Sequence, residues 1–177
     1  MIISVEKAKE LVSFPDGWTD EKIKMKLLAV EQTIRAYTNN NFQNRGFRVQ
    51  ADIAAGVFMS ESLIPFSVGD TVQVSESRLN EGLFTVYTAD DQTFMVDEET
   101  RDEAAVLVTK IEYPADVVAC CVNLLEWEVN NRGKVGVQSE TLSRHSVTYF
   151  NMDGANQVMG YPASLLGCLK AYRKARC

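Results

Sequence analysis

The spacing of apolar residues changes twice along this chain, and that change limits what the chain can fold into. Up to about residue 46 they recur at steps of three and four, as in Ile23, Leu27 and Val30, which is the period of an amphipathic helix. From residue 47 to residue 112 they stand in short alternating runs between turn residues, which is typical of strands. Helical spacing returns after residue 112. The pattern predicts a helical domain interrupted by a β-rich insert.

The first two helices are predicted over residues 4–14 and 19–39. Ser4 and Thr19 are good N-caps because a hydroxyl can accept a hydrogen bond from a free N–H of the first turn. The second helix is expected to bury one apolar stripe and to expose the face that carries Lys22, Lys24, Glu31 and Arg35.

Two further helices are predicted near the end of the chain. One covers residues 113–131, with Pro114 in the first turn, where a missing N–H does no harm. The last begins at Tyr161 and Pro162 and carries basic residues at its C-terminal end. Between them, residues 134–150 are too polar for a core and are expected to form an extended arm or a hairpin.

The fold class follows from these segments. We predict an α+β fold in which residues 1–46 and 113–177 form a small bundle of about four helices. Residues 47–112 form an inserted small antiparallel β-barrel or sandwich, with strands expected near 72–74, 84–87, 94–96 and 105–108. The extended arm precedes the last helix.

Charge is unevenly distributed between the two parts. The whole chain has a net charge of −6, but residues 47–112 contain thirteen acidic and four basic residues and so have a charge of −9. Small barrels of the SH3 type sometimes bind nucleic acid, yet binding depends on neutralising phosphates with Lys and Arg. The insert is therefore expected to contact protein, or to avoid sticking to DNA.

Signals for catalysis or a cofactor are absent from the sequence. His145 is the only histidine, and its neighbours form no nucleophilic triad. There is no phosphate-binding loop or dinucleotide fingerprint, and Asp90, Asp91 and the acidic run at 97–99 do not have the spacing of a calcium loop. We predict no enzyme activity, no cofactor and no metal site, although an enzyme that uses a cleft between the insert and the helices stays open as an alternative.

The four cysteines and the N-terminus suggest a reducing compartment. There is no C-x-x-C or zinc spacing, and Cys121 and Cys168 are expected to be small buried hydrophobes. No apolar run is long enough to span a membrane. The N-terminus lacks the features of a signal peptide, so we expect a cytosolic protein.

Outside the insert, about 110 residues resemble the head–tail connector (adaptor) proteins of tailed bacteriophages. The resemblance rests on the opening helix pair, which includes the run LLAVEQTIRAYTNN, and on the helix at 113–131. It continues in the segments GVQSET (136–141), SVTY (146–149) and YPASLL (161–166), followed by LKAYR (169–173). The 47–112 insert departs from simpler members, so no family role transfers to it.

The resemblance implies a structural virion protein in the phage neck. It would form a ring, expected to be a dodecamer, under the portal protein, and would extend the DNA channel for the passing double-stranded DNA without sequence-specific binding. The ring would also be a platform for the next component, a head-completion (stopper) or tail-terminator protein. The location would be the virion, after assembly in the host cytoplasm.

Two groups of residues are candidates for partner binding. The arm could add a strand to a neighbour, and its candidates are Val137, Ser139, Glu140, Val147 and Tyr149. The basic C-terminal end could dock on an acidic portal surface, and its candidates are Lys170, Arg173, Lys174 and Arg176. A solvated helix end whose charges favour the helix dipole explains the second group equally well. The other function that stays open is a non-viral or accessory protein-binding module that uses the β-insert.

Overall fold

A computed structural model of the chain describes residues 1–134, 139–142, 145–148 and 156–175. The chain divides into two compact units. The barrel unit comprises Met1 and residues 41–113, and the helical unit comprises residues 2–40 and 114–177. The sequence pattern predicted junctions at 46/47 and 112/113, whereas the barrel unit begins at residue 41 and ends at residue 113.

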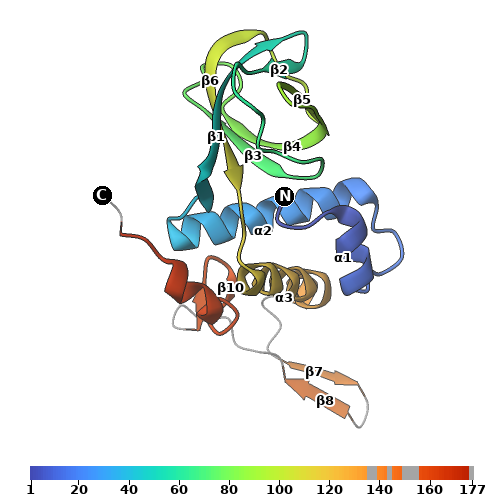
Figure 1. Cartoon of the computed structure of the whole chain (residues 1–177). Coiled ribbons are helices and arrows are strands. Elements are labelled where there is room, and N and C mark those ends of the chain that lie inside the picture. Colours follow the sequence, from blue (N-terminus) through green and yellow to red (C-terminus); the bar gives the residue numbers. More distant parts are fainter. Residues whose placement is uncertain (135–138, 143–144, 149–155, 176–177) are drawn as a thin grey trace. The chain divides into compact units, whose positions relative to one another are not determined.

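The barrel unit is a closed antiparallel barrel of six strands in the order β1-β2-β5-β4-β3-β6 (Figure 1). The strands are β1 (Gln43–Ala54), β2 (Val57–Met59), β3 (Thr71–Ser75), β4 (Gly82–Ala89), β5 (Thr93–Val96) and β6 (Glu103–Ile111). Because the sheet closes into a barrel, the alternative of a β-sandwich, which the sequence pattern also allowed, is excluded. Closure also removes the free edges at which an open sheet can aggregate.

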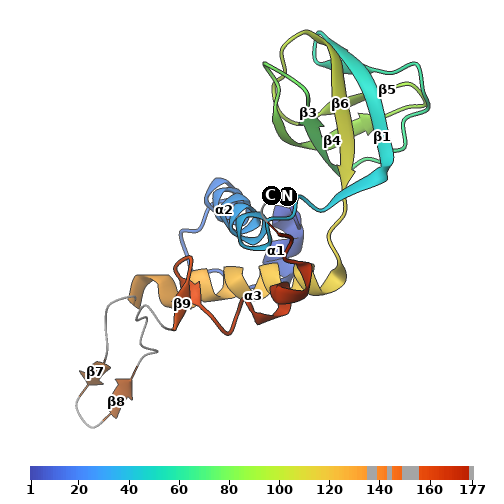
Figure 2. The same ribbon diagram turned by 90° about the vertical axis from the view of Figure 1, so that its left-hand side faces the viewer.

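The long strand β1 lies beside β6, as Figure 2 shows, and pairs with β2 on its other side. Its register with β6 shifts between Asn44 and Arg48 and again between Ala51 and Ile53. At the second shift Ala105 has a φ of +59°, and its N–H donates to the Asp52 carboxylate at 2.8 Å. Such bulges increase local twist, which lets two strands bend around a small barrel.

Alternate side chains of the strands fill the barrel interior. From Val49 onward β1 alternates buried and exposed residues without a break. At the centre the Phe58 and Phe94 rings stack with centroids 4.5 Å apart, and Phe66 meets Phe94 edge-on at 5.4 Å. The other buried members are Val49, Ala51, Ile53, Val72, Val74, Val86, Val106 and Val108.

A single carboxylate fixes the loop between β3 and β4 onto β6. Glu103 accepts hydrogen bonds from the Ser77 hydroxyl, the Asn80 amide and the N–H groups of Arg78 and Leu79, at 2.5 to 3.2 Å. These bonds favour the charged form, and the bond from Ser77 is the strongest cause that lowers the pKa of Glu103 to about 2.

The helical unit starts with α1 (Val5–Leu11) and α2 (Asp20–Thr38), whose N-caps Ser4 and Thr19 accept from the N–H groups of Lys7 and Lys22. Both predicted helices are confirmed. Asn39 ends α2 in the left-handed conformation, with a φ of 48°, which asparagine tolerates well. Glu31, expected on the exposed face, is instead 1% exposed.

The helix α3 (Ala115–Asn131) follows Pro114, as predicted, and leads into the 3₁₀ helix η1 (Arg132–Lys134). Figure 1 draws α2 from the side and α3 nearly end-on, and Figure 2 reverses them, so the two helices cross steeply. The buried face of α3 consists of Val117, Cys120, Cys121, Leu124, Leu125 and Glu128.

The cysteine prediction is right for Cys121 and wrong for Cys168, which is exposed. Cys120, for which burial was not predicted, is buried. Burial, together with the nearby charge of Glu31, raises the pKa of the Cys121 thiol to about 12. Burial likewise raises the pKa of Cys120, so both thiols are protonated and unreactive at neutral pH.

The last part of the chain corrects the predicted fold class. Residues 161–172 do not form a fourth α-helix: β10 (Tyr161–Pro162) pairs with β9 (Gln157–Val158), and the 3₁₀ helix η2 (Gly167–Tyr172) follows a turn. The strands β7 (Ser139–Leu142) and β8 (His145–Thr148) form a hairpin within the predicted arm. The expected bundle of about four helices is therefore wrong. The described residues form a closed six-stranded barrel with three α-helices, which is an α+β fold of a different make-up.

Candidate partner-binding site

The residues proposed for partner binding fall in two segments of the helical unit. Val137, Tyr149 and Arg176 lie outside the described residues. Ser139 and Glu140 belong to β7, and Val147 belongs to β8. Lys170 lies in η2, and Arg173 and Lys174 follow it.

The hairpin brings the first group together through its backbone. Ser139 pairs with Thr148, and Glu140 pairs with Val147. Within the described residues this sheet has two strands, so each strand has one edge that no third strand pairs. A two-stranded hairpin is marginally stable in water by itself, and an unpaired edge can bind a further strand. Its backbone thus has the geometry that strand addition requires.

The C-terminal segment is bound to the end of α2. The N–H of Lys174 donates to the Thr38 carbonyl at 2.8 Å, and the Asn39 side chain donates to the Ala175 carbonyl at 2.9 Å. The Arg173 guanidinium lies 5.2 Å from the centre of the Tyr37 ring. Arg173 therefore has a structural contact within its own unit, whereas Lys170 and Lys174 are exposed and available to a partner.

Contacts with α3 hold the same segment from the other side. The Tyr172 hydroxyl donates to both carboxylate oxygens of Asp116, at 2.6 and 2.8 Å, and this bond raises the pKa of Tyr172. Leu166 and Leu169 are fully buried. The proposed stabilisation of an α-helix dipole by these basic residues is thus wrong, because a six-residue 3₁₀ helix takes the place of that helix.

A buried ionic cluster, which we name the Glu128 cluster, connects three elements of the helical unit. Glu128 on α3 accepts from Lys26 on α2 at 2.9 Å and from the Nε of Arg132 at 2.9 Å. Arg132 also donates to the Gly160 carbonyl at 3.0 Å. Its guanidinium lies over the rings of Trp127 and Tyr161, with centroids at 4.7 and 5.0 Å.

The surroundings of Glu128 favour the charged form of its carboxylate. Burial acts to raise the pKa of Glu128, but hydrogen bonds from Arg132, Lys26 and Tyr161 outweigh it and lower the pKa to about 2. Burial and the Glu128 charge raise the pKa of Tyr161. The cluster was not found from the sequence, although the spacing of Glu128 and Arg132 by four residues is a recognisable helix ion pair. Its role is to hold the segment before η2 against α3.

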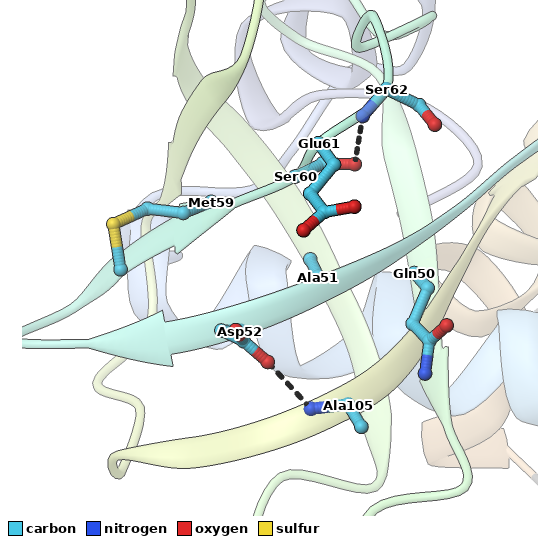
Figure 3. A pocket seen from close by; sticks show the side chains of 8 residues that line it. All are labelled: Gln50, Ala51, Asp52, Met59, Ser60, Glu61, Ser62 and Ala105. Atoms are coloured by element: carbon cyan, nitrogen blue, oxygen red, sulfur yellow. Dashed lines mark hydrogen bonds between the residues drawn. The ribbon is translucent and has the colours of Figure 1, made fainter.

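The barrel carries a shallow hollow of about 300 Å³ on its outer side (Figure 3). Its lining residues are Gln50, Ala51, Asp52, Met59, Ser60, Glu61, Ser62 and Ala105. The Ser60 hydroxyl accepts from the N–H of Ser62 at 3.1 Å, and the Asp52 carboxylate accepts from the Ala105 N–H at 2.8 Å. These two side chains stabilise the local backbone.

In the part of the chain that the structure describes, no three His, Cys, Asp or Glu side chains are grouped to hold a metal ion. No helix among the described residues is long and apolar enough to cross a membrane. No protein-family model matches the sequence, and no curated protein matches it.

Proposed function

We propose that this chain is a structural virion protein, a head–tail adaptor that forms a ring under the portal of a tailed bacteriophage. The ring extends the DNA channel and is the platform for a stopper or tail-terminator protein. One observation carries the proposal: the segments that resemble adaptor proteins belong to one compact unit, residues 2–40 and 114–177, and the barrel is a separate unit. An insertion into an adaptor would have this organisation.

The helical unit has two features that suit attachment to a ring-shaped partner. The β7–β8 hairpin offers strand edges to a neighbouring subunit or to the portal. The exposed charges of Lys170 and Lys174 stand on a backbone that is fixed to α2 and α3. A fixed base lowers the entropy lost when these lysines bind an acidic surface.

The charge of the barrel unit supports a place near the DNA channel. Residues 41–113 contain thirteen acidic and five basic residues, a net charge of −8. A surface of this charge repels the phosphate backbone, so a passing duplex would not be retained. The protein would be assembled in the host cytoplasm and would remain in the neck of the virion.

Electron microscopy tests the proposal. This protein is mixed with the portal protein encoded in the same genome, and the particles are scored for an additional ring beneath the portal. We expect a ring whose symmetry matches the portal, and its loss in a Lys170→Glu, Lys174→Glu double variant. Lys7→Glu is the control, since Lys7 lies on α1 and its side chain, paired with Glu10, is 57% exposed. Absence of a ring with the unmodified protein would refute the adaptor function and favour a binding module that uses the barrel.

A further inference from the structure

The outer surface of the barrel carries a row of mostly apolar side chains across four strands. Backbone pairing aligns Ala54 of β1 with Val57 of β2, Val57 with Met95 of β5, and Met95 with Thr88 of β4. Met95 is 39% exposed. Tyr87 lies at the register shift between Val86 and Thr88, so that it and Thr88 are both exposed, and Tyr87 is 63% exposed. We name this surface the barrel face; it consists of Ala54, Val57, Met59, Tyr87, Thr88 and Met95.

Acidic residues border the barrel face. Asp52 stands directly opposite Met59 in the register of β1 and β2. Asp90 and Asp97 follow the ends of β4 and β5, and Glu61 lies two residues beyond β2; all of them are exposed. The strands β2, β4 and β5 contain no Lys or Arg. The barrel face is thus an apolar surface with a negative border.

The helix α2 carries a second exposed apolar surface, on the side opposite its core stripe. Met25 is 60% exposed and Leu28 is 38% exposed. Ala29, Gln32 and Ala36 are exposed as well. Ala29 and Gln32 follow Met25 by four and seven residues, and Ala36 follows Gln32 by four, so all of them lie on one side of the helix. We name this surface the α2 face.

The border of the α2 face carries a net positive charge. Glu21, four residues before Met25, is exposed at its N-terminal end, but two lysines outweigh this single acidic residue. Lys22 and Lys24 lie on either side of the face by helical spacing, and both are exposed. The ammonium of Lys22 lies 4.2 Å from the centre of the Trp18 ring, which fixes its charge beside the face. The α2 face therefore complements the barrel face in charge and resembles it in its apolar, methionine-containing centre.

We infer that the α2 face of one copy binds the barrel face of a second copy. Methionine adapts to irregular surfaces, and opposite borders select this pairing over barrel with barrel or α2 with α2. Because the two faces differ, a row of bound copies has a free α2 face at one end and a free barrel face at the other. Such a head-to-tail contact closes into a ring when the rotation between neighbouring copies fits. The inference rests on the proposed function, since it names the contact that would build the adaptor ring.

Photochemical crosslinking with the protein alone tests this contact. A chain with benzoylphenylalanine at position 25 is mixed at millimolar concentration with ¹⁵N-labelled protein and irradiated, and crosslinked peptides are identified by mass spectrometry. Mixed-isotope products report contacts between copies only. We expect them to join position 25 to the stretch 82–97 or to Met59. Benzoylphenylalanine at Leu11, which is 51% exposed on α1, is the control probe and should give only background.

A variant of the labelled chain sharpens the result. Met95→Asp should lower the mixed-isotope yield about tenfold, because it places a charge in the apolar centre of the proposed contact. Leu63→Asp, at a side chain that is 73% exposed outside the barrel face, should leave the yield unchanged. The experiment with the unmodified labelled chain does not depend on how either variant folds.

The outcomes separate this inference from the proposed function. Absence of mixed-isotope products, or products that join position 25 to α2 of the labelled chain, would overturn the inference. A ring under the portal together with such a result would leave the adaptor function standing. The expected crosslinks without any ring would support the contact and refute the adaptor function.

Discussion

Glutamine in place of Glu128 removes the negative charge on which Lys26 and Arg132 converge, while keeping the size of the side chain. The Glu128 side chain is 3% exposed, whereas the side chains of Lys26 and Arg132 are 31% and 38% exposed. The two cations can therefore regain water after the change, but Glu128 has no comparable access to solvent. We expect the helical unit to lose stability and to keep its fold.

The magnitude follows from the pKa of Glu128, which the cluster lowers from an ordinary value of 4.5 to about 2. One unit of pKa corresponds to about 1.4 kcal/mol of differential interaction, so the charge contributes at most about 3 kcal/mol. Partial hydration of Lys26 and Arg132 reduces this contribution. We expect Glu128→Gln to lower the free energy of unfolding by about 2 kcal/mol.

Tryptophan fluorescence during urea unfolding measures this loss selectively. Trp18 and Trp127 both belong to the helical unit, and residues 41–113 contain no tryptophan. The urea midpoint should fall by about 1 M, given the usual dependence of unfolding on urea. The control is Glu126→Gln, the same substitution at an exposed position of the same helix, and its midpoint should stay close to that of the unmodified protein.

The pH dependence gives a second criterion. Because the folded-state pKa of Glu128 lies below its ordinary value, its contribution is complete above about pH 4.5 and is lost as the pH falls towards 2. The difference between the unmodified protein and Glu128→Gln should shrink over this range. Equal midpoints for the Glu128 and Glu126 variants at neutral pH, or a difference independent of pH, would refute the assigned role of the cluster.

Two further predictions concern the barrel unit. A fragment of residues 41–113 should fold alone into a soluble β-protein, because its core is complete and its ends pair at Gln43 and Ile111; a disordered far-ultraviolet circular dichroism spectrum would contradict this. Glu103→Gln should increase amide hydrogen exchange at residues 77–80 above pH 4.5, and the difference should vanish as the pH falls towards 2, because the pKa of Glu103 is lowered to about 2. Glu99→Gln, at an exposed position, is the matched control, and equal exchange in both variants would argue against the loop anchor.

Helix prediction succeeded where local signals were sufficient and failed where they were ambiguous. For α2, the Thr19 cap and the apolar stripe are both local features of the sequence. At the C-terminus, the apolar residues Leu166, Leu169 and Tyr172 recur at steps of three, which fits a 3₁₀ helix as well as an α-helix. Pro162 is buried in β10, and only its packing decides against a helix there.

The buried face of α3 is a second case in which local sequence signals were not sufficient. The helical spacing of Val118, Val122 and Val129 relative to Cys121 and Leu125 predicts one buried stripe, yet these three valines are only partly buried. Cys120 and Glu128 take core positions instead. The local sequence does not show that Glu128 is buried, because its burial depends on Lys26, which is 102 residues away in the sequence.

The sequence by itself determined the two helices with hydroxyl caps, the helix after Pro114, the strand-rich centre of the chain and its acidic charge, because these depend on residues within a few positions of one another. It could not determine that the central strands close into a barrel. The polar start of β1, from Gln43 to Arg48, becomes a strand through its pairing with β6, more than 60 residues later. The Glu128 cluster, the docked C-terminal segment and the two exposed apolar faces also exist only in the tertiary structure, because long-range packing selects which side of each element meets water.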